Sequence, residues 1–360
     1  MKRIAVIGLR GFPGVQGGVE VHCENLYSCF SEDSRVTVYR RTPYLSSHSK
    51  RTYKNIDFVD LPSTRLKGFE AVLHTFLSSC HAILHRPDVV HIHNIGPGMF
   101  TPFLKLFGLK VCVTYHSSNY EHNKWGYLAK KILRFSEWLS LYFADEVIFV
   151  NKFQMQKVGS LCKGNKHYVP NGINRVSHSE STDFLEKHGL EKGKYVLGVG
   201  RITQEKGFDV LIKAILKRRE VRHLVIAGAS DHDKTYYEKL KSLDVYNKVI
   251  FTGYTTGEDL RQLYSHARLF VLSSFNEGFP LVLLEAMGYG LPLVVTDIPA
   301  THLLTLPSED YVPVGDFEQM AEVIKQKWYN APKRVTYDLT EFDWNKIAFD
   351  TEKILKGECK

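Results

Sequence analysis

The chain has 360 residues, of which 44% are hydrophobic and 24% charged, proportions typical of an ordinary soluble globular protein. This length exceeds one average domain and suits two of roughly 150–200 residues each. No stretch approaches the ~20 consecutive apolar residues that span a bilayer. The six cysteines form no C-x-x-C pair, which argues against a disulfide scaffold or a cysteine zinc site and favours a reducing cytoplasm.

The net charge of +8 is unevenly distributed along the chain. Residues 1–175 hold 23 Lys and Arg against 12 Asp and Glu, whereas residues 176–360 hold 24 against 27. The basic first half favours an anionic partner. The sequence contains no helix-turn-helix, zinc finger or aromatic RNA platform, so nucleic acid is not the expected partner. An anionic membrane surface or a lipid-linked pyrophosphate accounts for the bias, and solvated surface lysines are the simpler alternative.

In the first half, short apolar runs alternate with helical patterns. The first run meets a glycine loop, so it is interpreted as a strand and not as a signal peptide. The strands are predicted at Arg3–Ile7, Val36–Tyr39, Phe58–Leu61, Val89–His93, Val111–Tyr115 and Val147–Val150, and the helices at Glu20–Phe30, Phe69–His85 and Leu128–Phe143. Apolar strands that alternate with helices are typical of a parallel, doubly wound sheet.

The pattern restarts after a polar stretch that runs from Pro170 to Ser181. Strands are predicted at Tyr195–Val199, His223–Ile226, Val249–Phe251, Leu269–Leu272 and Leu293–Val295, and helices at Gly207–Lys217, Thr235–Leu243, Gly257–His266, Leu281–Met287 and Trp344–Lys356. The sequence therefore predicts two Rossmann-like α/β domains, 1–175 and 176–343, with a final helix at about 344–360 that packs back on the first. Domains facing each other in this way would form a cleft at the carboxyl ends of their sheets, where ligands of open α/β folds bind.

The most informative segment is Asn276–Met287, in which two glutamates are separated by seven residues and a Gly-Phe-Pro bend. Pro280 disfavours helical geometry at the preceding residue and suits the first turn of a helix. Glu277 is therefore expected in a loop and Glu285 inside the helix, whose first amides form an anion and hydroxyl site. An ionised carboxylate only accepts hydrogen bonds and can hold two adjacent hydroxyls, so the pair suits a sugar and a ribose.

This segment resembles the E-x7-E element of the family 4 retaining GT-B glycosyltransferases. The resemblance implies that Glu277 contacts hydroxyls of the donor sugar and that Glu285 binds the ribose of the nucleotide. It also implies donor contacts at Gly278, Phe279 and Leu281. A surface glutamate beside an ordinary helix glutamate is the alternative for either residue taken alone.

A second segment, Gly200–Gly207, follows a predicted strand and opens a helix. Its glycines let the backbone approach a ligand, and Arg201 and Lys206 supply positive charge. The segment is similar to the G-R-x4-K-G element of the same family, whose Arg and Lys neutralise the departing diphosphate. The resemblance implies that role for Arg201 and Lys206 and a donor contact at Gly200. Solvated side chains are the alternative for both cations.

The loop after the first strand runs from Gly11 to Glu20. It lacks the G-x-G-x-x-G spacing, and no acidic residue follows the second strand, which disfavours an NAD-dependent oxidoreductase. Its G-G-V-E tail resembles the first loop of the family, which implies that Gly17 and Gly18 approach the donor phosphate or the acceptor. A plain tight turn is the alternative.

Histidines end two neighbouring strands of the first half. His116 stands where the family places a histidine near the donor sugar and the reaction centre, and a neutral imidazole can hydrogen-bond a hydroxyl. His91 and His93 close the preceding strand and are expected to face the same cleft. Asn119 replaces a carboxylate found in many family members, which argues against a general base there.

Less specific matches extend the resemblance to nearly the whole chain. Pro170-Asn171-Gly172 is similar to the interdomain turn of the family, and Asn123–Gly126, with the basic helix after it, resembles a bacterial polysaccharide subgroup. Gly253 and Tyr254 follow a strand at the place where the backbone of the family contacts the nucleotide base.

No metal ion and no cofactor are expected. Asp231-His232-Asp233 has the D-x-D form of a metal-bound nucleotide site, but it lies in a Gly-Ala-Ser loop and is interpreted as solvated. Arg201 and Lys206 would supply the charge that a metal ion supplies elsewhere.

The resemblance implies retaining transfer of a hexose or deoxyhexose from a UDP-, GDP- or dTDP-linked donor to a hydroxyl of a lipid-linked capsular or O-antigen polysaccharide. It would act in the cytoplasm or at the inner face of the membrane. The alternatives are a sugar-nucleotide epimerase or phosphorylase on the same fold, and a non-catalytic sugar-nucleotide-binding subunit.

Overall fold

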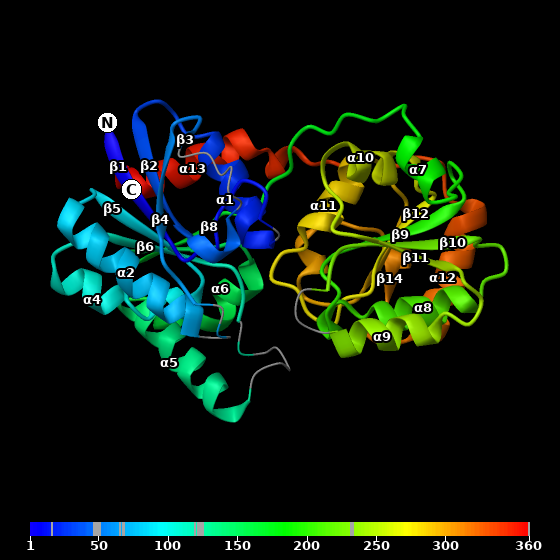
Figure 1. The fold of residues 1–360 in the computed structure, drawn as a ribbon, viewed down its shortest axis with the longest axis horizontal. Helices are drawn as coiled ribbons and strands as arrows, with labels where there is room; N and C mark the ends of the chain where they lie inside the picture. The colour runs from blue at the N-terminus through cyan, green and yellow to red at the C-terminus, as the bar shows by residue number, and fades with distance from the viewer. Residues whose placement is uncertain are drawn as a thin grey trace. The chain divides into compact units, whose positions relative to one another are not determined.

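The computed structural model describes residues 1–15, 17–45, 52–64, 66, 69–118, 120, 126–230 and 234–358. The chain divides into two compact units. The first comprises Met1–Asn174 together with Thr340–Lys360, and the second comprises Arg175–Leu339. Figure 1 shows a twisted sheet with helices around it in each unit.

The first unit contains, in its described residues, an eight-stranded sheet in the order β3-β4-β2-β1-β5-β6-β7-β8. The strands are β1 (Lys2–Ile7), β2 (Ser34–Arg41), β3 (Thr52–Tyr53), β4 (Ile56–Leu61), β5 (Val89–His93), β6 (Val111–Tyr115), β7 (Glu146–Phe149) and β8 (Asn165–Tyr168). The pairings are parallel except for β3 with β4. The helices are α1 (Gly18–Ser28), α2 (Phe69–His85), α3 (Ile95–Gly98), α4 (Thr101–Leu106), α5 (Tyr127–Phe143), α6 (Lys152–Val158) and α13 (Trp344–Lys356).

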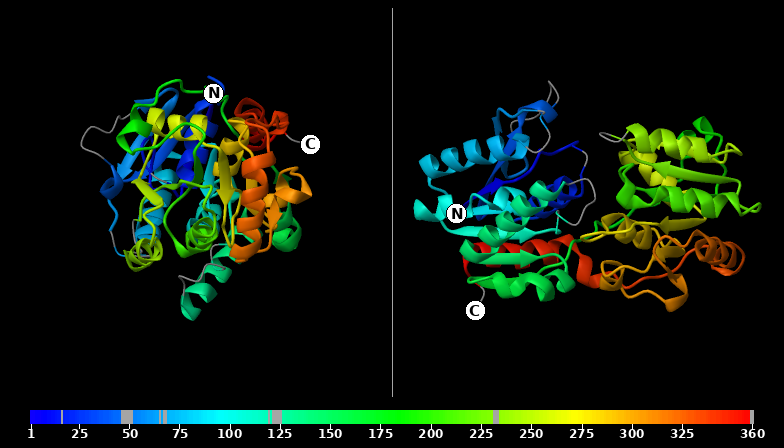
Figure 2. Two further views of the ribbon diagram at one scale, coloured as in Figure 1. Left: turned by 90° about the vertical axis from the view of Figure 1, so that its right-hand side faces the viewer. Right: turned by 90° about the horizontal axis from the view of Figure 1, so that it is seen from below.

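Both faces of this sheet are covered, because alternate residues of a strand point to opposite sides. Ile4 and Val6 of β1 belong to a buried cluster with residues of α1 and α13, whereas Ala5 and Ile7 belong to a second cluster with residues of α2, α4 and α5. Figure 2 shows α13 (red) beside the blue and cyan elements of the first unit, although it is the last helix of the chain. Trp344 of this helix is buried.

The second unit contains a six-stranded parallel sheet among its described residues, in the order β11-β10-β9-β12-β13-β14. The strands are β9 (Tyr195–Val199), β10 (His223–Ala227), β11 (Val249–Gly253), β12 (Leu269–Leu272), β13 (Leu293–Thr296) and β14 (Tyr311–Val312). The helices are α7 (Asp183–Lys187), α8 (Phe208–Leu216), α9 (Lys234–Leu243), α10 (Gly257–His266), α11 (Leu281–Gly288) and α12 (Phe317–Asn330). Apolar residues of α8, α9 and α12 pack together on one face, and α10 and α11 lie on the other side in Figure 1.

The predicted fold class, two parallel-sheet α/β domains, is confirmed. The strands predicted at Val89–His93, Val111–Tyr115 and Tyr195–Val199 have the predicted bounds. Helix α8 begins at Phe208 and not at the predicted Gly207, because Gly207 adopts a left-handed conformation (φ 61°) that helices exclude. Strand β8 and helix α12 were not predicted. No helix in the described part of the chain is long and apolar enough to cross a membrane.

Candidate functional site

The predicted donor residues of the second unit lie at the carboxyl edge of its sheet. From β9 the chain passes to β10 on one side, and β12 later pairs with β9 on the other side. Such a reversal of strand order opens a crevice at the carboxyl ends of the two central strands, where open α/β folds bind ligands. The segment Gly200–Gly207 follows β9, and the segment from Ser273 to Pro280 follows β12. The two motifs therefore leave neighbouring strands at the same edge.

Lys206 and Glu277 form an ion pair across this edge. The Lys206 Nζ donates to Glu277 Oε1 at 2.5 Å, and the Ser274 hydroxyl donates to the same oxygen at 2.6 Å. The two charged side chains are only 19% and 12% exposed. The structure thus brings together a cation that the sequence assigned to the diphosphate and a carboxylate that it assigned to the sugar.

The backbone around Lys206 is fastened to the loop after β12. The Ser273 hydroxyl donates to the carbonyl of Lys206 at 2.8 Å, and the Phe275 amide donates to the carbonyl of Glu205 at 2.8 Å. Gly207 lies so close to this loop that a Cβ atom there would overlap the carbonyl oxygen of Ser273. These backbone contacts therefore hold the two loops that carry Lys206 and Glu277 against each other.

Gly200 and Arg201 lie directly after β9. The φ of Gly200 is 153°, and a Cβ atom there would be 3.3 Å from Cε of Lys206, so the lysine side chain passes close over this glycine. The guanidinium of Arg201 makes no hydrogen bond or ion pair with the described residues, and it is partly exposed. It is thus a cation with capacity to bind an anionic ligand.

The bend at Gly278-Phe279-Pro280 leads directly into α11. Pro280 is the residue immediately before the helix, one position earlier than the first-turn position that the sequence favoured. The Leu281 amide donates to the Phe279 carbonyl at 3.1 Å. The side chain of Phe279 is buried. As predicted, Glu277 lies in the loop and Glu285 inside the helix.

Glu285 is held by a tyrosine. The Tyr264 hydroxyl donates to Glu285 Oε2 at 2.8 Å, and the Tyr264 ring stacks on Tyr289 with centroids 5.1 Å apart. Burial raises the pKa of Glu285, and the hydrogen bond from Tyr264 partly opposes this rise. The second oxygen, Oε1, makes no hydrogen bond with the described residues and can accept one from a ligand hydroxyl.

Gly253 and Tyr254 lie at the carboxyl end of β11, the outermost strand on that side of the sheet. Gly253 has a φ of 72°, and Tyr254 is 47% exposed. They share the edge with Lys206 and Glu277 but are separated from β9 by strand β10.

The remaining predicted residues belong to the first unit. Gly17 and Gly18 lie at the start of α1, after β1, and His116 follows β6 directly. His93 is the last residue of β5, between β1 and β6 in the sheet. These residues share the carboxyl edge of the first sheet, where its strand order reverses between β1 and β5.

His116 belongs to a buried histidine cluster in which His22 was not predicted. His93 Nδ1 lies 3.0 Å from His116 Nε2, and the ring centroids of His22 and His116 are 4.8 Å apart. Burial lowers the pKa of His22 to about 4 and that of His91 to about 3, and it lowers the pKa values of His93 and His116 as well. All four imidazoles are therefore neutral at pH 7. The signal for His22 was its place in the helical apolar stripe of α1, beside Cys23.

Three sequence interpretations lie outside the described residues. They are the D-x-D segment Asp231–Asp233, the substitution at Asn119, and residues 123–125 of the polysaccharide-subgroup segment.

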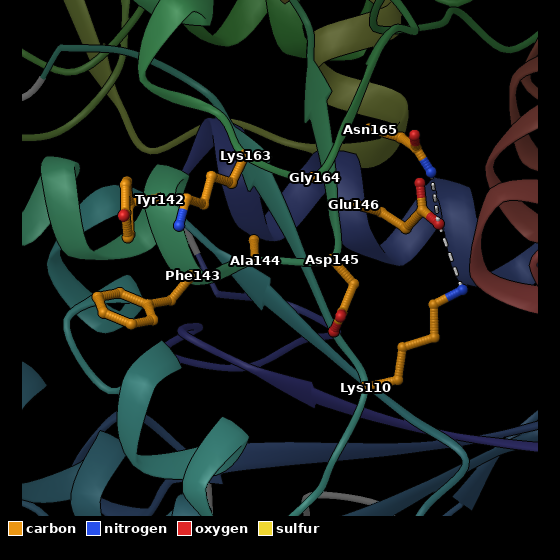
Figure 3. A pocket seen from close by; sticks show the side chains of 9 residues that line it. All are labelled: Lys110, Tyr142, Phe143, Ala144, Asp145, Glu146, Lys163, Gly164 and Asn165. Atoms are coloured by element: carbon orange, nitrogen blue, oxygen red, sulfur yellow. Dashed lines mark hydrogen bonds and ion pairs between the residues drawn. The ribbon is translucent and has the colours of Figure 1, made fainter.

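A separate pocket lies at the opposite, amino edge of the first sheet. Figure 3 shows it between the starts of β7 and β8, with Lys110 and Glu146 paired at 3.3 Å. Asp145 of this pocket pairs with Lys105, and the pocket contains none of the predicted site residues.

Two family models match the chain. The model for Glycosyltransferase Family 4 matches residues 16–176, and the model for Glycosyl transferases group 1 matches residues 180–326. The chain is 29% identical over 326 residues to an uncharacterized glycosyltransferase of Methanocaldococcus jannaschii, a match that covers 82% of this chain and 80% of that protein. It is 22% identical over 224 residues to the O-antigen biosynthesis glycosyltransferase WclY of Escherichia coli, covering 60% and 63% of the two chains.

Solved structures share the fold over the full length. Sucrose-phosphate synthase from Thermosynechococcus elongatus matches with a TM-score of 0.85 at 20% identity, covering 99% of both chains. Anabaena HepE in complex with UDP-glucose matches with a TM-score of 0.79 at 17% identity, covering 99% of this chain and 100% of that one.

Proposed function

Because the chain belongs to the GT-B glycosyltransferases of the family 4 and group 1 type, we propose that it transfers a hexose or deoxyhexose from a nucleotide diphosphate sugar to a hydroxyl of a lipid-linked bacterial polysaccharide. The observation that carries the proposal is the Lys206–Glu277 pair at the strand reversal of the second unit, with Glu285 and the cation Arg201 on the same edge.

The pair has the chemistry that a sugar diphosphate needs. In the free protein, Lys206 is paired with the carboxylate of Glu277. When the donor binds, its phosphate oxygens accept hydrogen bonds from Lys206 and Arg201, and its sugar hydroxyls donate to the carboxylate of Glu277. The ligand replaces one charge-assisted contact by several. Glu285, through its second oxygen, holds the ribose. The UDP-glucose bound to HepE supports a donor of this class.

Catalysis in this proposal is electrostatic. The negative charge that develops on the departing diphosphate is stabilised by Lys206 and Arg201, which are positioned before reaction by the backbone bonds of their loop. Both glutamates hold hydroxyls and neither serves as a covalent nucleophile, so we infer same-face attack, with retention of configuration and the departing phosphate accepting the proton of the acceptor. No metal ion is needed at the diphosphate.

The acceptor is proposed from three independent features. The first half of the chain carries a surplus of 11 positive charges, which suits a lipid-linked pyrophosphate or an anionic bilayer. The relative WclY is named for O-antigen biosynthesis. Helix α5 exposes the apolar side chains of Leu128, Ile132 and Phe135 at helical spacing beside Lys131 and Arg134, which is the pattern of a helix that rests on an anionic membrane.

A thermal-shift screen tests the donor assignment. The full chain is heated with UDP, GDP, dTDP and their sugar conjugates, because a ligand that binds only the folded state raises Tm. We expect one nucleotide series to raise Tm, and more with the sugar than without it. A flat response to all of them would contradict the proposal. Release of an altered free sugar without an acceptor would instead favour an epimerase or a phosphorylase.

A further inference from the structure

The histidine cluster of the first unit contains more coordinating groups than a sugar-binding edge requires. One ring nitrogen of each of His22, His93 and His116 lies within 4.8 Å of the corresponding nitrogens of the other two. The three side chains come from α1, from the end of β5 and from the residue after β6. All three are buried, and His116 is the most exposed at 8%.

His22 supplies an unused lone pair to this cluster. Its Nδ1 lies 2.6 Å from Oδ1 of Asn171, an oxygen that only accepts, so the proton of the neutral ring is on Nδ1. Its Nε2 is then an acceptor, and it is buried without a hydrogen-bond partner among the described residues. A buried imidazole nitrogen left in this state is costly unless something else binds it.

The hydrogen-bond partners of His93 can also leave one nitrogen of that ring with an unused lone pair. The Tyr27 hydroxyl lies 2.7 Å from His93 Nε2 and 2.8 Å from His91 Nδ1, and His91 Nε2 lies 2.7 Å from the Thr114 hydroxyl. When His93 Nε2 donates to Tyr27, Tyr27 donates to His91 and His91 donates to Thr114, both rings and the Tyr27 hydroxyl have an acceptor for their protons. His93 Nδ1 is then a lone pair that faces His116 Nε2.

We propose that His22, His93 and His116 form a binding site for a divalent transition-metal ion, with zinc as the ion of choice. Neutral imidazoles are ligands of zinc, and three of them leave a fourth position open for water or a substrate oxygen. Asn171 and Tyr27 orient two of the three rings through their other nitrogens, as outer-shell partners of metal-bound histidines do.

Metal binding requires small local changes. Zn–N bonds of about 2.0–2.1 Å set two ligating nitrogens about 3.3 Å apart, so His93 and His116, now 3.0 Å apart, separate slightly. The proton of His116 moves from Nε2 to Nδ1, where it stays available to donate to a hydroxyl. The ion would be bound within the first unit. It is separate from the proposed stabilisation of the diphosphate, which uses Lys206 and Arg201 of the second unit.

Cobalt titration tests the site without any sugar nucleotide. The full chain is stripped with a chelator, dialysed and titrated with Co²⁺, whose visible absorption reports four-coordinate binding, and Zn²⁺ is then added as competitor. We expect one Co²⁺ per chain, displaced by one Zn²⁺. His22→Gln should weaken binding at least about tenfold, and Asn171→Ala should weaken it about tenfold.

His74→Gln is the matched control, because it removes a buried histidine of the same unit that lies in α2 and belongs neither to the cluster nor to the hydrogen-bond chain of His93. It should keep the wild-type affinity. Circular dichroism checks that each variant folds. If His22→Gln does not fold, the loss of Co²⁺ affinity is measured with His116→Gln instead. No Co²⁺ binding by the wild type, or equal binding by the wild type and the folded ligand variant, would overturn the site. Either result leaves the donor assignment intact, because that assignment is tested by nucleotide binding.

Discussion

At the scale of single residues, Glu277 is the proposed acceptor of hydrogen bonds from the sugar hydroxyls. In Glu277→Gln the carboxylate becomes an amide, which is a weaker acceptor and forms no ion pair with Lys206. We expect kcat/KM for the donor to fall about 10²–10³-fold, the size found when one charge-stabilising group is removed from an active site. Turnover of the donor with a polysaccharide acceptor is the measurement.

Glu318→Gln is the control for this change. Glu318 also pairs with a lysine, Lys217, in the second unit, but the carboxylate is 62% exposed and lies in α12, apart from the motif loops. Its variant should turn over donor at the wild-type rate. Full activity of Glu277→Gln would refute its role in donor binding.

The raised pKa of Glu285 predicts how nucleotide affinity depends on pH. A carboxyl with a raised pKa takes up its proton at a higher pH than an ordinary glutamate, and the protonated form accepts fewer hydroxyl hydrogen bonds. Nucleotide affinity should therefore be greatest well above this pKa and should fall as the pH is lowered through it. Titration calorimetry of a nucleoside diphosphate between pH 7.5 and about 5 measures the fall.

Glu285→Gln separates this effect from titration of the phosphates, because both proteins bind the same ligand. The variant should bind more weakly at pH 7.5 and lose less affinity on acidification than the wild type. Parallel pH profiles for the two proteins would show that Glu285 does not hold the nucleotide.

At the scale of elements, the turn before α8 fixes Lys206 over the sheet edge. Gly207→Ala puts a Cβ atom on a left-handed residue and against the Ser273 carbonyl, and we expect it to destabilise the second unit by about 2–4 kcal/mol. Gly189→Ala is the control, since Gly189 has a similar φ of 63° but no described atom within 4 Å of the added Cβ. It should cost only about 1 kcal/mol. Urea unfolding measures both, and equal losses would show that the contact with Ser273 does not constrain the turn.

Helix α5 carries the proposed membrane contact. Ile132 and Phe135 are 51% and 59% exposed, next to Lys131 and Arg134. The double variant Ile132→Ser with Phe135→Ser should bind vesicles that contain anionic lipid about tenfold more weakly or worse, because two apolar side chains no longer enter the bilayer. Sedimentation with vesicles measures binding. Phe349→Ser, which removes a 56% exposed phenylalanine of α13, should have no effect. Binding that is equal for all three proteins would exclude α5 as the contact.

At the scale of the whole molecule, the sequence predicted the sheets well because their strands are buried on both faces. Runs such as Val89–His93 and Val111–Tyr115 are rich in β-branched residues and buried at every position, and each is flanked by a helix. Helix α12 was missed although Met320 and Ile324 have helical spacing and are buried. Strand β8 was missed because its residues are polar and mostly exposed.

The site was predicted in its residues but not in its contacts. The motifs that contain Lys206 and Glu277 are visible in the sequence, yet their ion pair joins residues 71 positions apart and depends on β9 pairing with β12. The histidine cluster depends in the same way on the order β1-β5-β6, which brings α1 beside the ends of two strands. Strand order is a property of the whole sheet, and local patterns do not encode it.

The roles of Lys206 and Glu277 in donor binding are separated by the affinities of a nucleoside diphosphate and of its sugar conjugate, chosen by the thermal screen. These affinities are measured for the wild type, Lys206→Met and Glu277→Gln. Calorimetry should show that Lys206→Met binds both ligands at least about tenfold more weakly, because the diphosphate loses a charge-assisted contact. Glu277→Gln should keep its affinity for the diphosphate and lose the preference for the sugar conjugate. Wild-type affinities of both folded variants for both ligands would contradict donor binding by Lys206 and Glu277.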